Sequence, residues 1–229
     1  MKVLVIDVGG THVKVLATGR RTALKLPSGP DLTPSMMVTE VLAATKDWAY
    51  DVVSIGFPGP VANGRPSREP WNLGTGWVDF DFDAALGHPV RVINDAAMQA
   101  LGSYDGGNML FLGLGTGLGS TMIRDNLVIP LELAHLPYRH GKTYEEYVGN
   151  AGYKRLGKRA WRRHVHVVTA LFIAAMQVDY IVLGGGNARH LRELPENARL
   201  GDNANAFKGG FRLWEQPGDR PIISKKKRR

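Results

Sequence analysis

The chain has 229 residues and contains no cysteine. This length allows one or two domains with a sizeable hydrophobic core. The absence of cysteine excludes disulfides, thiolate zinc sites, iron–sulfur clusters and cysteine nucleophiles. With 29 Lys and Arg against 21 Asp and Glu, the net charge is +8. On composition alone, this charge indicates a polyanionic partner such as nucleic acid, an anionic membrane or a phosphorylated molecule.

The excess positive charge belongs to two segments. The last five residues, 225–229, are all basic, and six further basic residues lie within segment 154–163. Without the tail the net charge is +3, and without both segments it is −3. The second segment contributes Lys154, Arg155, Lys158, Arg159, Arg162 and Arg163.

No targeting or membrane-spanning segment is predicted. The apolar run at 3–6 is too short for a signal peptide and ends at Asp7. The uncharged segment 167–178 is too short to cross a bilayer. We therefore expect a soluble, cytoplasmic protein without a membrane partner.

The first half of the chain alternates strands and helices. Two short apolar strands flank a Gly-Gly-Thr turn, which is the pattern of a β-hairpin. Asp95 is placed to cap the helix that follows it. Strands are predicted at 2–7, 13–17, 52–57 and 90–93, and helices at 35–48, 80–86 and 96–103.

The second half repeats the unit of strand, glycine turn and strand about 100 residues later. Helical patterns follow, with breaks expected near Gly149, Gly152 and Gly157, and the pattern weakens after Pro195. The alternation predicts an α/β fold, and the repeat suggests two related domains. Strands are predicted at 109–112, 120–123, 127–129 and 180–183, and helices at 144–163 and 165–177.

The first glycine turn has the residue types of a phosphate site. Gly9 and Gly10 let backbone N–H groups approach an anion, and the Thr11 hydroxyl can donate to it. Asp7 could hold Mg²⁺ through water, since Mg²⁺ prefers hard oxygen ligands. Lys14 either faces a phosphate or is solvated. The alternative for the whole motif is a plain hairpin turn.

The second glycine turn, 113–120, matches neither of the two commonest phosphate loops. A GxGxxG pattern would need glycine at 118 or 120, and the Walker-like tail at 141–143 lacks glycine at 136. A structural hairpin is one interpretation. A cradle made of several loops is the other, and it would include the late triple glycine. Its candidate residues are Gly115, Thr116, Gly117, Gly184, Gly185 and Gly186.

Polar residues at other predicted loops suit sugar chemistry. Asp95 follows a strand and Asn94, so it could serve as a general base, although an ordinary helix cap has the same appearance. Glu132 and His135 can bond hydroxyl groups, and the alternatives are a zinc pair or a surface histidine. Asn72 lies between Trp71 and Trp77, which form either an apolar sugar platform or part of the core.

As a set, these motifs resemble the ROK family (repressor, ORF, kinase) of sugar kinases, in the actin/hexokinase superfamily. They follow the family's order over about 190 residues. Loop 56–61 and the chain length look most like polyphosphate glucokinases. The matching segments are Asp7–Thr11 and Leu112–Ser120 (phosphate loops), Ile93–Gly102 (NDANAAALG type), Glu132–His135 (ExGH), Tyr144–Tyr147 (LExY) and Leu183–Gly186 (adenosine side).

The resemblance implies an α/β actin-like, ribonuclease H-like fold, with domains at 1–105 and 106–229 and a substrate cleft between them. It implies transfer of a phosphoryl group from ATP or polyphosphate to the 6-hydroxyl of a hexose, most simply glucose, with Mg²⁺ as cofactor. It also implies a homodimer. Asp95 takes the role of catalytic base. The sugar contacts are Asn72, Asn94, Asp95, Glu132, His135 and Glu145.

The sequence also departs from the family. No cysteine is present to build its CxCGxxGC zinc knuckle, so no zinc is expected, and Ala134 replaces the glycine of ExGH. An inactive homologue that regulates by binding sugar is therefore the alternative function. The cluster at 154–163 is either a solvated helix face or a track for a long donor such as polyphosphate. The tail at 225–229 is expected to be a solvated end rather than a nucleic-acid contact.

Overall fold

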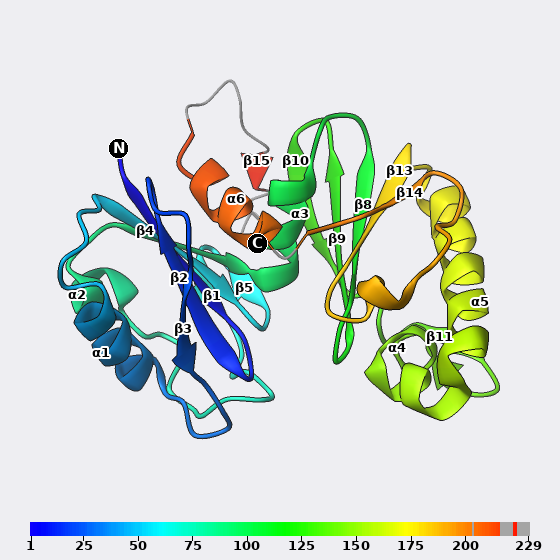
Figure 1. Cartoon of the computed structure of the whole chain (residues 1–229), viewed down its shortest axis with the longest axis horizontal. Helices are drawn as coiled ribbons and strands as arrows, with labels where there is room; N and C mark the ends of the chain where they lie inside the picture. Colours follow the sequence, from blue (N-terminus) through cyan, green and yellow to red (C-terminus); the bar gives the residue numbers. More distant parts are fainter. Residues whose placement is uncertain (203, 216–221, 224–229) are drawn as a thin grey trace, which may run out of the picture. The chain divides into compact units, whose positions relative to one another are not determined.

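The computed structural model describes residues 1–202, 204–215 and 222–223 (Figure 1). The described chain divides into two compact units: unit 1 holds 1–98 and 206–215, and unit 2 holds 99–202, 204–205 and 222–223. The domains expected at 1–105 and 106–229 remain a prediction; in the described chain the first unit ends at Met98 and segment 206–215 groups with it. The basic tail 225–229 lies outside the described residues.

Unit 1 is built on a five-stranded sheet in the order β3-β2-β1-β4-β7. β1 is antiparallel to β2 and parallel to β4, which is parallel to β7. Every residue of β1 and β4 is buried, as expected for parallel strands that are covered on both faces. The strands are β1 (Val3–Val8), β2 (His12–Ala17), β3 (Leu24–Pro27), β4 (Val52–Phe57) and β7 (Val90–Asn94).

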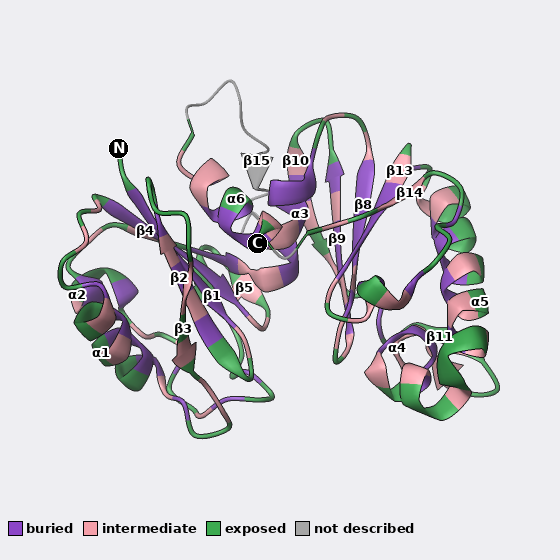
Figure 2. Ribbon diagram, viewed as in Figure 1, coloured by how far each residue is buried: buried purple, intermediate pink, exposed green. Residues whose placement is uncertain are grey.

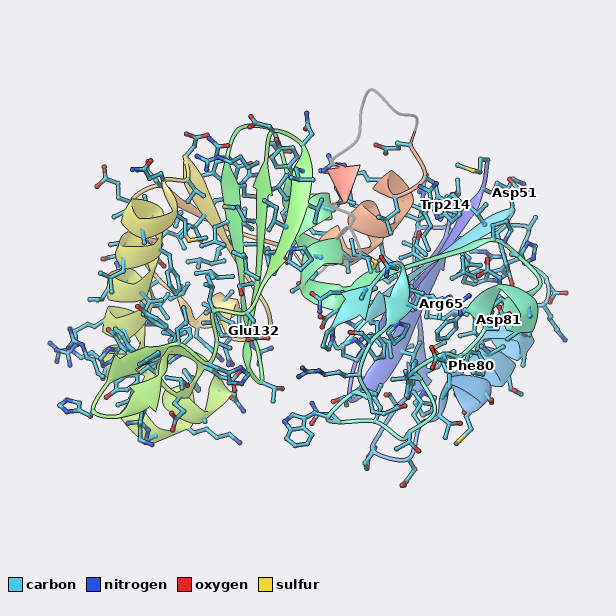
Figure 3. All side chains as sticks on the ribbon, turned by 180° about the vertical axis from the view of Figure 1, so that it is seen from behind. Asp51, Arg65, Phe80, Asp81, Glu132 and Trp214 are labelled. Atoms are coloured by element: carbon cyan, nitrogen blue, oxygen red, sulfur yellow. The ribbon has the colours of Figure 1, made fainter. Side chains whose placement is uncertain are left out.

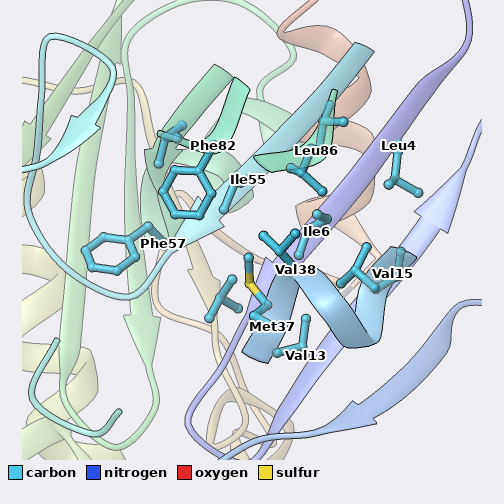
Figure 4. Packing of buried hydrophobic residues seen from close by; sticks show 14 of the residues in the cluster. Leu4, Ile6, Val13, Val15, Met37, Val38, Ile55, Phe57, Phe82 and Leu86 are labelled. Atoms are coloured by element: carbon cyan, nitrogen blue, oxygen red, sulfur yellow. The ribbon is translucent and has the colours of Figure 1, made fainter. Parts of the chain in front are cut away.

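Two helices supply the apolar core on one face of this sheet. α1 (Pro34–Ala44) contributes Met37 and Val38, and α2 (Phe82–Leu86) contributes its two terminal residues (Figure 4). The Thr33 hydroxyl accepts the amide of Met36 and begins α1. The helix predicted at 35–48 therefore starts as expected but ends earlier, where Thr45 caps the final turn.

The C-terminal helix α6 (Asn205–Arg212) covers residues on the other face of the same sheet. A side chain at Gly210 would overlap Val5, so this glycine permits the close approach of helix and strand. The Ser54 hydroxyl donates to the Gly210 carbonyl at 2.6 Å and accepts from the Trp214 indole at 2.9 Å (Figure 3). These contacts explain why 206–215 belongs to unit 1.

Unit 2 has a six-stranded sheet in the order β14-β13-β8-β9-β10-β15. β8 and β9 form the second glycine hairpin, and β13 runs parallel to β8. Helix α3 (Asp95–Ser103) crosses from unit 1 to unit 2 after Met98. The strands are β8 (Met109–Leu114), β9 (Leu118–Arg124), β10 (Leu127–Leu131), β13 (Tyr180–Gly184), β14 (Ala198–Leu200) and β15 (Ile222–Ile223).

The long helix α5 (Asn150–Met176) lies beside this sheet and buries Trp161, Val165 and Phe172 in the core of unit 2. The predicted breaks at Gly149 and Gly157 are confirmed: α4 (Tyr144–Val148) ends at the first, and α5 kinks at the second. Figure 2 shows buried and exposed residues alternating along α5.

Two predicted interruptions of this helix are wrong. Gly152 is buried within α5, where a side chain would overlap the Tyr147 carbonyl, so this glycine serves close packing rather than a turn. No break separates 163 from 165, because the helix continues through His164.

Short elements complete the described chain. They are β5 (Val61–Ala62), β6 (Arg65–Pro66), the hairpin of β11 (Pro137–Arg139) and β12 (Lys142–Thr143), and a 3-10 turn at Ala188–His190. Among the described residues, no helix combines the length and apolar character that a membrane span requires.

Candidate active site

One edge of the unit 1 sheet gathers the first group of site residues. Asp7 of β1 is in register with Gly56 of β4, and Gly56 is in register with Ile93 of β7. Because the three strands are parallel, their carboxyl ends lie at the same edge. Asp7 therefore lies near the end of β1, and Asp95 directly follows the end of β7. In the sheet, only β4 lies between these two strands.

Asp95 is half-buried at the first residue of α3. The structure corrects its expected role as helix cap, because the Asn94 carbonyl oxygen Oδ1 accepts the amide of Ala97 at 3.1 Å. Asp95 Oδ1 accepts the adjacent amide of Ala96 at 2.8 Å. No side chain of the described residues donates a hydrogen bond to Oδ2, so one carboxylate oxygen is available for chemistry.

Burial raises the pKa of Asp95 to about 7. The hydrogen bond from the Ala96 amide opposes this shift, and the negative charge of Asp7 adds to it. A carboxylate with a pKa near neutrality is a stronger base than an exposed aspartate and can still be ionised at physiological pH. This environment suits the removal of a proton from a hydroxyl group.

Gly56 keeps space open behind Asp95. A side chain at this position would overlap the thioether end of Met98 and would lie 3.7 Å from Cα of Asp95. Asn94 Nδ2 also donates to the Gly59 carbonyl at 3.0 Å, which ties the loop after β4 to the start of α3. Asn94 therefore positions Asp95 and retains one amide hydrogen for a ligand.

The first glycine turn presents free backbone donors beside Asp7. The Gly9 amide donates to the His12 carbonyl at 3.1 Å. The Ser28 hydroxyl donates to the Gly9 carbonyl at 2.6 Å. In the described chain, no hydrogen bond engages the amides of Gly10 and Thr11. Both residues are exposed, so the turn can receive an anion.

Lys14 makes an ion pair with Asp7, with Nζ 3.3 Å from Oδ2. Its side chain is about one third exposed, and that of Asp7 is largely buried. The lysine thus neutralises the carboxylate in this structure. It lies at the turn, where it can also meet an incoming phosphate.

Asn72 lies against the first glycine turn, with its Cβ close to Gly10. The two flanking tryptophans differ in a way that the sequence did not reveal. Trp77 is fully buried in the unit 1 core and cannot form a sugar platform, whereas Trp71 is 97% exposed. Buried Leu73 anchors the loop between them, so the structure brings Asn72 to the site and leaves only Trp71 as a candidate platform.

In unit 2, the second glycine turn is held from several sides. The Asn150 amide donates to the Gly115 carbonyl at 3.0 Å, and Asn187 Nδ2 donates to the same oxygen at 3.3 Å. A side chain at Gly117 would overlap the Glu145 carboxylate in its present position. Thr116 is exposed at the tip. This is a rigid loop with an accessible end.

The triple glycine has three separate functions. A side chain at Gly184 would approach the Phe111 ring to 2.6 Å, so this residue serves packing. Gly185 has a positive φ of 81°, and its Cα lies against the backbone of Leu114. Gly186 has open space around it. Of the three, Gly186 is therefore the candidate for direct donor contact.

Glu145 connects this turn to the sugar-binding candidates. Its Oε2 accepts the Leu118 amide at 3.1 Å, and its own amide donates to the Ala134 carbonyl at 3.0 Å. Ala134 is buried and its methyl group is accommodated in the unit 2 core. The replacement of glycine by alanine therefore leaves this segment ordered.

Glu132 and His135 remain exposed at the end of β10, where Figure 3 labels Glu132. Their side chains face one another, with Oε1 of Glu132 3.4 Å from Nδ1 of His135. In the part of the chain that the structure describes, no cluster of three or more His, Asp or Glu could hold a metal ion. The zinc-pair interpretation thus lacks further ligands, and the pair is open to a hydroxyl-bearing ligand.

Comparisons with known proteins show what the whole chain is similar to. A curated polyphosphate glucokinase of Mycobacterium tuberculosis (strain CDC 1551 / Oshkosh) is 27% identical over 207 residues, which cover 80% of this chain and 77% of the relative. The crystal structure of an inorganic polyphosphate/ATP-glucomannokinase from Arthrobacter sp. strain KM matches with 25% identity and a TM-score of 0.72, covering 91% of this chain and 96% of that one. The resemblance to ROK-family sugar kinases is confirmed.

Two further findings complete this comparison. A ROK family glucokinase from Streptomyces griseus, solved with glucose and AMPPNP, matches with a TM-score of 0.74 at 17% identity over 93% of this chain and 99% of that one, which supports the fold alone. The predicted α/β fold of ROK sugar kinases is confirmed. No family model matches the chain.

Several residues that build this ROK-like site carry no motif signal of their own. Ser28, Asn150 and Asn187 donate hydrogen bonds to backbone carbonyls of the site loops. Asn187 directly follows the triple glycine and Asn150 directly follows Gly149, so their positions beside glycines were the only available hint.

Proposed function

We propose that the chain is a hexokinase that transfers a phosphoryl group from polyphosphate or ATP to the 6-hydroxyl of glucose. The relatives support a phosphotransferase with an alcohol acceptor, of glucokinase type. The single observation that carries the proposal is the environment of Asp95, a half-buried carboxylate with a pKa of about 7 and one uncommitted oxygen.

In the proposed reaction, Asp95 accepts the hydroxyl proton while the sugar oxygen forms a bond to the terminal phosphorus. The bond from that phosphorus to the bridging oxygen breaks, and the remaining donor leaves with the electron pair. In such a loose transition state, the protein contributes by positioning the reactants and by stabilising negative charge on the phosphoryl group, rather than by covalent catalysis. Asn94 supports the step by fixing the start of α3, on which Asp95 stands.

The first glycine turn is the proposed site for the transferred phosphate. The free amides of Gly10 and Thr11 would donate to phosphate oxygens, and Lys14 would add positive charge. Asp7 is the residue that would hold Mg²⁺, through water and together with donor phosphate, since one carboxylate and several waters suit this ion. When bound, Mg²⁺ would neutralise phosphate charge.

Unit 2 supplies the remaining proposed contacts. Glu132 and His135 would bond sugar hydroxyls together with Asn72 of unit 1, and Glu145 would add a contact through the carboxylate oxygen that the Leu118 amide does not engage. The turn at 115–117 and Gly186 would receive the donor. A homodimer and a cytoplasmic location remain predictions.

The second candidate function is a sugar-binding regulator without catalysis. Ala134 favoured this alternative, but the Ala134 carbonyl holds the Glu145 amide and the segment is intact. A regulator would need no carboxylate with a raised pKa at the sugar hydroxyl. The structure of the Asp95 site therefore favours the enzyme.

A coupled assay tests the proposal. Glucose, mannose and N-acetylglucosamine are each incubated with ATP or with long-chain polyphosphate, in the presence of Mg²⁺, and sugar 6-phosphate is measured. We expect turnover of glucose with at least one donor. Binding of glucose without turnover by either donor would instead establish the regulator.

A further inference from the structure

The exposed side of α5 in unit 2 carries a concentration of positive charge that the proposed site does not use. We call this the basic surface and define it by four exposed side chains. None of them forms an ion pair or hydrogen bond with another described residue. The four are Lys154, Lys158, Arg159 and Arg163.

The arrangement of these residues opposes folding rather than assisting it. The helix kinks at Gly157, where φ is 72°, so the single helical wheel expected from the sequence does not apply. After the kink, basic residues recur one turn apart at 158 and 162 and at 159 and 163. Each like-charged pair at this spacing costs a few tenths of a kcal/mol, roughly 0.2–0.5 kcal/mol.

Two other basic residues of the same segment form hydrogen bonds that stabilise the fold. Arg155 donates to the Glu146 carbonyl at 2.8 Å, and Arg162 donates to the His190 carbonyl at 2.7 Å. Their contacts fix the helix against the neighbouring loops. The four residues of the basic surface lack such contacts, so their charge is available to a partner.

The basic surface begins beside the proposed donor loop. The first residue of α5, Asn150, donates its amide to the carbonyl of Gly115 at 3.0 Å. Lys154, the first residue of the basic surface, follows four positions later in the same helix, before the kink at Gly157. Positive charge thus leads away from the second glycine turn along one helix.

Two histidines, one on this helix and one on the neighbouring 3-10 turn, lie among these positive charges. Burial lowers the pKa of His164, and the charges of Arg139, Arg163 and Arg155 lower it further. Burial also lowers the pKa of His190, with added effects from Arg189, Lys158 and Arg162. Both rings are therefore expected to be neutral at pH 7 and to leave the surrounding cations unopposed.

We propose that the basic surface binds the distal part of an inorganic polyphosphate chain whose phosphates next to the transferred one are received at the second glycine turn. This inference rests on the proposed kinase function and adds a donor-binding surface outside the transfer site. A linear polyanion has charge along its whole length, whereas the three phosphates of ATP end in a nucleoside. The surface would therefore strengthen binding of long polyphosphate selectively.

Nucleic acid fits the same helix less well. Proteins that bind single strands combine positive charge with aromatic side chains on which the bases stack. The aromatic residues of α5 are committed to the interior: Trp161 and Phe172 are buried, and Tyr153 stacks on His190 at 4.8 Å. A partner made of phosphates alone needs no such platform.

The test compares two charge-reversed variants. Arg159→Glu with Arg163→Glu alters the basic surface, and Arg21→Glu with Lys46→Glu makes the same change of charge at exposed sites of unit 1. KM is measured for long-chain polyphosphate, tripolyphosphate and ATP at saturating glucose. Binding of fluorescent long-chain polyphosphate is measured separately by anisotropy over a range of KCl concentrations.

We expect the α5 variant to raise KM for long-chain polyphosphate roughly tenfold, with less than a twofold change for ATP and tripolyphosphate. Its binding should also depend less steeply on salt. The unit 1 variant should match the wild type. Arg159→Gln with Arg163→Gln should give an intermediate effect, which separates loss of attraction from misfolding.

Three results would overturn the inference. The first is an unchanged KM for long-chain polyphosphate, and the second is an equal rise for ATP. The third, measured by anisotropy with a fluorescent oligonucleotide, is loss of oligonucleotide binding in the α5 variant while its KM for polyphosphate is preserved. Failure of the kinase proposal looks different, because wild-type protein would then phosphorylate no sugar with any donor. In that case the anisotropy measurement still decides whether the basic surface binds polyphosphate.

Discussion

At the scale of single residues, Asn94 caps helix α3, and this leaves the Asp95 carboxylate available as a base. An aspartate at the start of a helix ordinarily accepts amides of the first turn and acts as a cap. Here Asn94 accepts the Ala97 amide, and Asp95 keeps one oxygen without a donor from any described side chain. Burial and the charge of Asp7 then raise the pKa of Asp95 to about 7.

This pKa predicts how activity depends on pH. Only the ionised carboxylate can accept a proton, so kcat/KM for glucose should rise about tenfold per pH unit below pH 7 and level off above it. The profile is measured at saturating donor, because donor phosphates titrate in the same range. A flat profile between pH 5.5 and 8.5 would remove Asp95 from the role of base.

The same shift predicts a cost in stability. The pKa is raised in the folded state, so between about pH 4 and pH 7 the folded protein retains a proton that the unfolded chain has released. The free energy of unfolding must therefore fall as pH rises through this window. Asp95→Asn removes the effect and should gain stability relative to wild type as pH increases.

Urea unfolding of both proteins at pH 4.5 and pH 8 measures this difference. The advantage of Asp95→Asn should be larger at pH 8. Asp31→Asn, at an exposed carboxylate of the same unit, is the matched control for loss of charge. An advantage of equal size at both pH values would show that Asp95 does not titrate between them in the folded state.

Residue types alone predicted some site residues but could not tell a buried tryptophan from an exposed one nearby. Asp7 and Asp95 were predicted from strand ends and glycine turns, because local sequence determines those features. The opposite exposures of Trp71 and Trp77 depend on how loop 69–78 folds back on the core, where Glu69 accepts the amides of Trp77 and Val78. Such tertiary contacts leave no periodic signal in the sequence.

At the scale of elements, the hairpin β11–β12 joins the Glu132–His135 segment to α4. Aromatic packing holds it in this chain. The Tyr138 ring stacks on Tyr144 with centroids 4.9 Å apart and meets Tyr147 edge-on at 5.0 Å. The Tyr138 hydroxyl lies 3.2 Å from Nδ1 of His164 on α5. These contacts can order the segment without a metal.

Removing the ring should therefore destabilise unit 2. Tyr138→Ala is expected to lose about 2 kcal/mol of unfolding free energy, because the half-buried ring loses its packing against two tyrosines. Tyr138→Phe keeps the ring and should lose less than half of this. Both values come from urea denaturation.

The metal prediction is tested on the wild-type protein by thermal melting with and without a chelator. The same Tm in both conditions is expected, since aromatic packing holds the hairpin. A drop of several degrees in the chelator would mean that a bound metal stabilises the fold.

Most elements could be predicted because their signals are local. The hairpins and buried strands have apolar runs bounded by glycine, and their ends agree within a few residues. Helix α6 was missed because two glycines at 209 and 210 weaken its helical pattern. Gly210 is explained by the close approach to Val5, a contact that spans most of the chain.

At the scale of the whole molecule, the net charge of +8 has a local origin. Five of the charges lie in the tail 225–229, outside the described residues. The second cluster is on α5, where four side chains form the basic surface. Overall basicity therefore does not indicate a general nucleic-acid-binding protein, and the inference about polyphosphate concerns one helix.

Each compact unit contributes some of the proposed site residues. Asp7, Asn72 and Asp95 belong to unit 1, and Glu132 and Glu145 belong to unit 2. The sequence predicted two domains from its repeated hairpins, because each hairpin is a local feature. The grouping of 206–215 with unit 1 depends on contacts with Ser54 and Val5, which lie far away in sequence.

The central claim is that Asp95 is the catalytic base of a sugar kinase, and one comparison tests it most directly. Asp95→Asn is assayed for glucose phosphorylation and, separately, for glucose binding by calorimetry, with Asp31→Asn as control. We predict that kcat falls roughly 10²- to 10⁴-fold while the Kd for glucose changes less than threefold. Turnover within tenfold of wild type, with glucose binding intact, would contradict the account.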